Sequence, residues 1–301
     1  MFMARNRPQE RKVSEREALR LGTLERRYDF HLGEAIRATL QGSHDKAATH
    51  SGTALSISRE LYAGASDPAR HQAELAAALC NHARYGGTLH ALALLTESAG
   101  HYAELAEADP AVYEVPRIDV LTRIALATDA SGNPSGAVRL LREIVRMYLT
   151  APAADPAERD LAMARARFHL GRCLLKTGAS ADGLAETDAG LTVAEAAVGR
   201  LGIRVRGPGW LAAAPRCLQF VAPDWVVAAV RAMTLHAAAE RWESAAAAAS
   251  AAVRISGGLA DLGGDTLREA HDDIRAQADV IRRHAEPQHT ALFSPLVSEP
   301  S

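Results

Sequence analysis

The chain has 301 residues, of which 48% are hydrophobic and 23% charged, a composition typical of a folded globular protein. A formal net charge of −2 gives no overall attraction to nucleic acid or to an anionic membrane surface. No segment reaches the roughly 18 uncharged apolar residues of a membrane span, and the N-terminus lacks the apolar run of a signal peptide. We therefore expect a cytoplasmic protein.

Three cysteines, Cys80, Cys173 and Cys217, lie far apart in the sequence and form no C-x-x-C pair. This spacing argues against a disulfide framework or a structural zinc site, and it favours reduced thiols. Residues 1–20 are basic, and we expect them to form a partly disordered arm before the first helix.

The tripeptide Asp-Pro-Ala occurs three times, with its aspartates at Asp67, Asp109 and Asp155. An aspartate caps the free amide groups at a helix start, and proline fits the first helical position, where its missing N–H costs nothing. The three copies therefore predict three helix starts. Their intervals of 42 and 46 residues indicate a structural repeat.

Glycines recur at the intervals of this repeat, each followed five residues later by a small residue. The pairs are Gly42–Ala47, Gly86–Ala91, Gly132–Ala137 and Gly178–Gly183. The glycines are 44, 46 and 46 residues apart, and Glu240–Ala245 follows as a fifth pair after a longer interval of 62 residues. Each pair separates two stretches whose apolar residues recur at helical spacing, so every glycine is predicted to end one helix of a hairpin. The small residue allows the second helix to approach the first closely.

These features resemble the tetratricopeptide-repeat (TPR) family. The segment 169–183 contains the Leu170-Gly171 pair, the turn glycine Gly178 and the small Gly183, while Trp242 and Ala245 match the aromatic residue and alanine of the family's turn. The period near 46 departs from the family's 34, and its tryptophan near the start of the first helix is absent. The resemblance covers residues 25–256 and implies an all-α, right-handed superhelical solenoid of about five antiparallel helix pairs.

The predicted organisation places repeats one to four in residues 21–198 and an irregular insertion, rich in proline and glycine, in residues 199–224. The fifth repeat and a C-terminal capping helix occupy residues 225–284, because 265–284 is strongly amphipathic. Residues 285–301 read as a disordered tail.

Recognised enzyme motifs for nucleophilic, nucleotide-dependent or zinc-dependent chemistry are missing from the sequence. The cluster His271-Asp272-Asp273 is the most suggestive one, but consecutive helix residues point in different directions, which favours a solvated face. We expect no cofactor, no metal and no catalytic residue.

One stripe of the predicted first helices is rich in cations. In the TPR family the first helices line a concave groove that binds extended peptides. The corresponding residues here are Arg84, Arg123, Arg165, Phe168, His169, Arg172, Lys176 and Arg231, with Asp119 and Asp129 as acidic exceptions. Such a groove would bind an acidic segment or a C-terminal carboxylate, although the family's carboxylate clamp is not reproduced. Alternatively, these cations are simply solvated or paired with acidic neighbours.

Three large aromatic residues, Trp210, Phe220 and Trp225, lie in or beside the insertion. Exposed together, they would form a lid or a binding hot spot, whereas buried they would plug the gap in the regular stacking.

The sequence favours a non-catalytic protein-interaction or scaffold module. A ligand- or peptide-sensing regulator is the alternative, and an enzyme that uses His169 between the groove and the insertion is a third reading without motif support.

Overall fold

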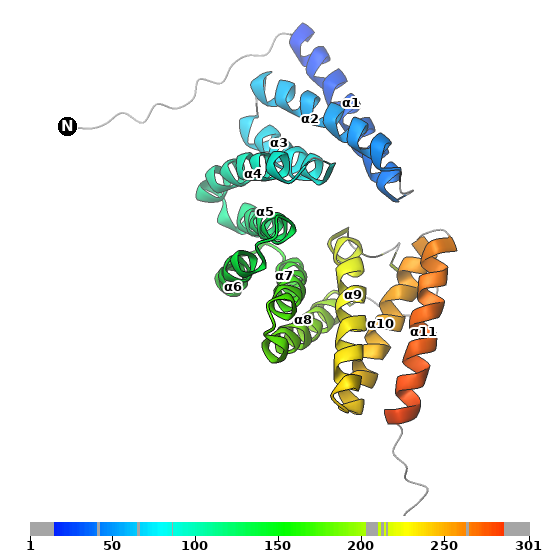
Figure 1. Cartoon of the computed structure of the whole chain (residues 1–301). Coiled ribbons are helices and arrows are strands. Elements are labelled where there is room, and N and C mark those ends of the chain that lie inside the picture. The colour runs from blue at the N-terminus through cyan, green and yellow to red at the C-terminus, as the bar shows by residue number, and fades with distance from the viewer. Residues whose placement is uncertain are drawn as a thin grey trace, which may run out of the picture. The chain divides into compact units, whose positions relative to one another are not determined.

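The computed structural model describes residues 15–40, 43–64, 67–85, 87–202, 210–211, 214, 216–262 and 265–285. Almost all of these residues are helical, and none of them lies in a strand (Figure 1). The α-helices are α1 (Glu15–Leu40), α2 (His44–Gly64), α3 (Pro68–His82), α4 (Thr88–Ala108), α5 (Pro110–Ala130), α6 (Pro134–Thr150), α7 (Pro156–Lys176), α8 (Ser180–Arg200), α9 (Arg216–Ala238), α10 (Trp242–Leu262) and α11 (Asp265–Ala285). A short 3-10 helix, η1 (Ala83–Tyr85), follows α3.

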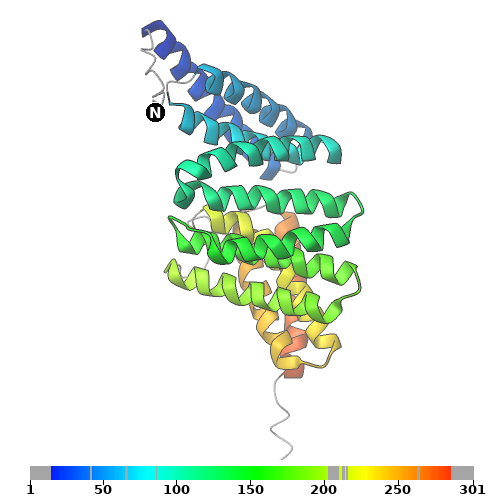
Figure 2. The same ribbon diagram turned by 90° about the vertical axis from the view of Figure 1, so that its left-hand side faces the viewer.

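The chain divides into two compact units, Met1–Arg159 and Asp160–Ser301. In the first unit, α1 packs on α2, α3 on α4 and α5 on α6, and each hairpin also contacts the next through α2–α3 and α4–α5. Figure 2 shows these helices, coloured from blue to green, lying one after another in a stack. A hydrophobic core runs along the α1–α5 part of the stack, with Leu61 and Leu79 fully buried.

In the second unit, α7 forms a hairpin with α8, α9 packs on α10, and α11 packs on α10. Trp242 at the start of α10 stacks on His284 near the end of α11, with ring centroids 4.8 Å apart, so the turn aromatic anchors the last helix. The described helices therefore comprise five consecutive hairpins followed by one further helix. This arrangement confirms the predicted all-α repeat of antiparallel helix pairs with its C-terminal helix.

The repeated Asp-Pro-Ala segments start helices as predicted. Each aspartate side chain accepts a hydrogen bond from the backbone N–H three residues later, at 3.3 Å in every case: Asp67 from Arg70, Asp109 from Val112, and Asp155 from Glu158. Proline follows in the first turn of α3, α5 and α7. The same local chemistry therefore begins the first helix of hairpins two, three and four.

The predicted turn residues of hairpins three, four and five share one backbone conformation. Gly132 and Gly178 have φ of 86° and 84°, and Glu240, at the position equivalent to glycine, has φ of 55°. In all three turns the next residue donates its backbone N–H to a carbonyl five residues earlier, the pattern of a Schellman helix end. These bonds join Asn133 to Thr128, Ala179 to Leu174, and Arg241 to His236. Gly42 and Gly86 lie outside the described residues.

The predicted close approach of paired helices is clearest in the α7–α8 hairpin. A Cβ atom on Gly171 would lie 2.7 Å from the carbonyl oxygen of Gly183, and one on Gly183 would lie 2.9 Å from the carbonyl oxygen of Gly171. Further along α8, a Cβ atom on Gly190 would meet the ring of Phe168 at 2.8 Å. The two helices pack at distances that only glycine permits at these positions.

Helix α9 begins at Arg216, so residues 216–224, expected in the irregular insertion, are helical and include Pro223. Proline removes one backbone hydrogen bond from a helix interior. Burial of neighbouring side chains offsets that loss, since Ala222 and Trp225 are both 0% exposed. At the N-terminus, α1 begins at Glu15, within the segment predicted as a partly disordered arm.

Candidate functional site

Two of the predicted groove residues lie in the first unit. Arg84 is exposed in η1. Arg123 on α5 is largely buried, with its side chain 13% exposed, and its Nε atom lies 3.2 Å from Asp119 Oδ2 on the same helix. Asp129, the second predicted acidic exception, is buried near the end of α5. Arg123 therefore neutralises one of the acidic residues that were predicted to share its stripe.

The other predicted cations lie in the second unit, on the facing first helices α7 and α9. Arg165 on α7 donates from Nε to Asp224 Oδ2 on α9 at 2.7 Å. His169, one turn further along α7, has its Nε2 atom 3.5 Å from the same carboxylate oxygen. Arg172 lies seven residues after Arg165 on α7, and Arg231 lies seven residues after Asp224 on α9. The matching offset indicates that α7 and α9 present corresponding turns to each other.

The charges of Arg165 and Asp224 balance each other at the buried end of the α7–α9 contact, where His169 also lies. Burial alone would raise the pKa of Asp224. Contacts with His169 and Arg165 nevertheless hold this pKa below its usual range. Burial, together with the positive charges of Arg165 and Arg172, lowers the pKa of His169. Arg165 and His169 are only 8% and 6% exposed. The three groups form an internal ionic contact rather than an open binding surface.

The other end of the α7–α9 contact carries three cationic residues. Arg172 and Arg231 are half-buried, and Lys176 at the end of α7 is exposed. Burial and, after it, the positive charge of Arg172 lower the pKa of Arg231. Asp224 is the single carboxylate of α9. We call Arg172, Lys176 and Arg231 the cationic face.

Phe168 and His169 were predicted to line an open groove, but both side chains are buried. Phe168 is 3% exposed and packs in the core against Gly190 of α8, so its ring is turned away from the cationic face. His169 is buried against Asp224, which leaves its imidazole without the access that a catalytic base needs. The geometry therefore gives no support to the enzyme reading that relied on His169.

Trp210 and Trp225 belong to the hydrophobic core of the second unit. Trp225 is fully buried, and Trp210 is 9% exposed with its indole against Gly258 of α10. Their burial favours the structural plug over the lid or hot spot. The side chain of Phe220 lies outside the described residues.

Cys80 and Cys173 are buried, and the side chain of Cys217 is outside the described part. Among the described residues, no group of three or more His, Cys, Asp or Glu side chains is arranged to hold a metal ion. None of the described helices combines the length and apolarity needed to cross a bilayer.

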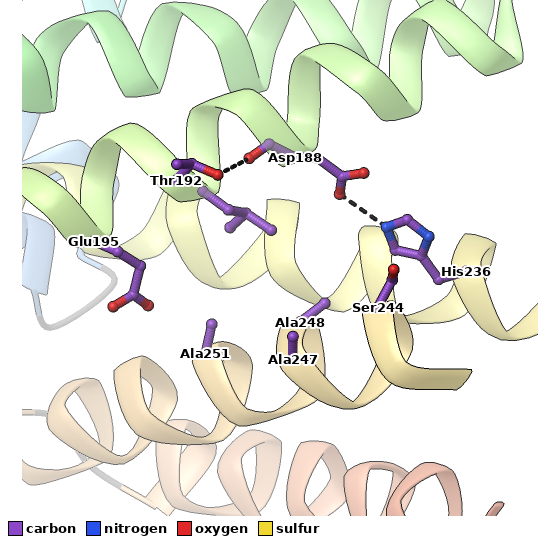
Figure 3. Close-up of a pocket in the computed structure, with 9 residues that line it drawn as sticks. Asp188, Thr192, Glu195, His236, Ser244, Ala247, Ala248 and Ala251 are labelled. Carbon is purple, nitrogen blue, oxygen red and sulfur yellow. Dashed lines mark hydrogen bonds and ion pairs between the residues drawn. The ribbon is translucent and has the colours of Figure 1, made fainter. Parts of the chain in front are cut away.

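A pocket that the sequence did not indicate lies between α8 and α10, the second helices of hairpins four and five (Figure 3). Its volume is about 440 Å³. One wall is a stripe of α8 with Asp188, Leu191, Thr192 and Glu195, and the other is a stripe of α10 with Ser244, Ala247, Ala248 and Ala251. The small side chains of α10 leave the space open. We call this space the α8–α10 pocket.

His236 of α9 closes one end of the α8–α10 pocket. Its side chain is 3% exposed, and Nε2 lies 2.9 Å from Asp188 Oδ1 (Figure 3). The Nδ1 atom is buried and has no hydrogen-bond partner among the described residues. At the other end, Glu195 forms an ion pair with Arg254 of α10. The pocket therefore has polar ends and an apolar middle.

The sequence patterns did not reveal Asp224, Asp188 or His236 as site residues. Asp224 was assigned to the irregular insertion, so no helical spacing connected it with Arg165. Asp188 and His236 are 48 residues apart and match no recognised motif. The run of small residues on α10 was the one sequence signal for the pocket, and it is equally consistent with close packing of helices.

Comparisons with known proteins give no functional assignment. No family model matches the chain, and no curated protein matches it. Among solved structures, the chain is similar to a Podosopora anserina protein assigned as a kinesin light chain with nearly identical TPR-like repeats. The TM-score is 0.38 at 15% identity, over 89% of this chain and 98% of that chain. A similarity at this level supports no conclusion about this chain. The hairpin architecture is established by the helix packing described above.

Proposed function

We propose that this protein is a non-catalytic interaction module whose cationic face binds an acidic segment or a C-terminal carboxylate of a partner protein. The observation that carries the proposal is the placement of two half-buried arginines, Arg172 and Arg231, each seven residues beyond the Arg165–Asp224 contact that joins α7 to α9, with Lys176 one turn further along α7. A carboxylate bound beside two half-buried guanidinium groups is attracted by both positive charges.

The chemistry of the cationic face suits a carboxylate ligand. Arginine presents a planar fork of donors that matches both oxygens of a carboxylate, and a half-buried guanidinium is less screened by solvent than an exposed one. The neighbouring Arg165–Asp224 contact fixes α7 against α9 and so holds Arg172 and Arg231 at a set spacing. The interaction would be sensitive to salt, because it depends on charge.

The structure refines which of the predicted residues we assign to this function. Arg165 and His169 become supporting residues, because they are buried and engaged with Asp224. Arg172, Lys176 and Arg231 carry the contact with the partner. A cytoplasmic scaffold role fits this kind of surface.

The test measures binding of a fluorescently labelled hexaglutamate peptide with a free C-terminus to the full chain, by fluorescence anisotropy at low and moderate salt. The double variant Arg172→Gln/Arg231→Gln should bind at least about tenfold more weakly, because two charge-assisted contacts are lost. An amidated copy of the peptide separates recognition of the acidic side chains from recognition of the terminal carboxylate.

The matched control is Arg268→Gln/Arg275→Gln, which removes two exposed arginines from α11 and changes the net charge equally. This control should bind the peptide almost as well as the unmodified chain. Equal weakening in both double variants would mean that only net charge matters, and the proposed face would be rejected.

A further inference from the structure

We propose that the α8–α10 pocket is a second recognition site, which receives an arginine side chain from a basic segment of a partner protein. It differs from the cationic face in both position and charge. The cationic face lies on the first helices α7 and α9, whereas the pocket walls are the second helices α8 and α10. The two sites would therefore hold partner segments of opposite charge.

The anionic end of the pocket is Asp188. His236 donates to one oxygen of this carboxylate and is itself almost fully buried. The Asp188 side chain nevertheless remains 41% exposed, so its carboxylate is fixed on one side and open to a cation on the other. A carboxylate held in place by a buried donor loses little conformational freedom when it binds a guanidinium.

The middle of the pocket suits the aliphatic part of an arginine. Leu191 is half-buried, and Ala248 and Ala251 are buried, which gives an apolar floor next to the Asp188 end. A guanidinium carries several N–H donors, so it can reach the hydroxyl of Ser244 as well as the carboxylate. It is also more weakly hydrated than an ammonium group and loses less on entering a partly enclosed space.

The open rim indicates a side chain from a longer segment rather than an enclosed small molecule. Thr192, Glu195, Ser244 and Ala247 are all exposed, so the pocket is a trough open along its length. Asp188 and Glu195 stand seven residues apart, which corresponds to about 10 Å along a helix. The Glu195–Arg254 ion pair at the far end offers further polar groups to the backbone of the bound segment.

The presence of Asp188, His236 and Ser244 around one pocket does not make a catalytic triad. In a triad, one imidazole nitrogen faces the carboxylate and the other faces the serine hydroxyl. Here Nε2 faces Asp188, but the buried Nδ1 atom has no hydrogen-bond partner among the described residues, so it does not contact Ser244. The geometry points to binding and not to nucleophilic chemistry.

The test is a titration of the ¹⁵N-labelled full chain with the peptide acetyl-Ala-Arg-Ala-amide, followed by two-dimensional NMR. We expect shift changes concentrated at the backbone amides of Leu191, Ala248 and their neighbours. Asp188→Asn should weaken binding at least about tenfold, because the charged acceptor is replaced by a neutral group of the same shape. Ala247→Leu, at an exposed rim position, should abolish binding by filling the trough.

Three controls test whether the peptide binds at this pocket and through its charge. Asp273→Asn on exposed α11 should bind as the unmodified chain does, and so should Arg172→Gln/Arg231→Gln, whose only expected defect is at the cationic face. A peptide with neutral citrulline in place of arginine should not bind. The proposal is overturned if pocket amides do not shift, if Asp188→Asn binds equally well, or if the citrulline peptide binds as tightly. Equal affinity for free arginine amide would overturn the assignment to a partner segment.

Discussion

Gly171 of α7 and Gly183 of α8 face each other so closely that a Cβ atom on either would lie within 3 Å of the other's carbonyl oxygen. One glycine comes from the Leu-Gly pair of the first helix and the other from the small position that opens the second. The contact therefore joins two separate sequence signatures of the repeat. It also sets how near α8 lies to the helix that carries Arg165 and Arg172.

Replacement of Gly171 by alanine should destabilise the chain by about 1–3 kcal/mol, because the added methyl group meets backbone atoms that cannot move aside. Urea unfolding followed by circular dichroism measures the effect. Gly199→Ala in α8 is the control, since nothing lies within 4 Å of its added Cβ atom. That variant should be neutral or more stable by up to about 1 kcal/mol, as expected for alanine in a helix. Similar losses in both variants would contradict the close contact.

Glu240→Gly should stabilise the fifth hairpin by up to about 1 kcal/mol. Glu240 has φ of 55°, a conformation that costs a non-glycine residue about 1–2 kcal/mol, partly offset by the greater freedom of glycine in the unfolded chain. The reverse change, Gly178→Ala, should destabilise the fourth hairpin by a similar amount. Thermal unfolding of the two variants provides the comparison, and a loss of stability in Glu240→Gly would refute the equivalence of the turns.

Asp224→Asn should destabilise the second unit, toward the lower end of the about 3–5 kcal/mol expected for breaking a buried ion pair, because the Asp224 side chain is 31% exposed. The folded-state pKa of Asp224 lies below its unfolded value. The stabilisation is therefore complete above pH about 4 and is lost as the pH falls toward the lower folded value. Unfolding measured from pH 6 to pH 2 should show a shallower acid loss in the variant. An unchanged acid limb would mean that Asp224 does not contribute.

The imidazoles of His31 on α1 and His50 on α2 meet with their Nδ1 atoms 3.0 Å apart, so one ring donates and the other accepts. Burial and the neighbouring His50 lower the pKa of His31. Below pH about 6.5 the unfolded chain therefore takes up a proton more readily than the folded chain. The free energy of unfolding should therefore decrease as the pH is lowered. His31→Gln should reduce this fall between pH 7 and pH 5. His44→Gln, at an exposed position on the same hairpin, is the control and should leave the slope unchanged.

The sequence by itself determined the repeat. Asp67, Asp109 and Asp155 cap helices, Gly132, Gly178 and Glu240 end them, and Gly183 admits the close partner helix. These features could be predicted because a cap, a turn or a small contact residue acts within a few positions along the chain. Such local physics leaves a pattern that can be recognised without coordinates.

Only the tertiary structure decided which side chains the repeat brings together. Arg165 meets Asp224 across 59 residues, and Asp188 meets His236 across 48, so neither contact has a local signature. The same reason explains Phe168 and Trp225, whose burial depends on the helices packed against them and not on their own helix. Helical spacing shows which residues share a stripe, but the neighbouring hairpin determines whether that stripe is buried, neutralised or left open to a partner.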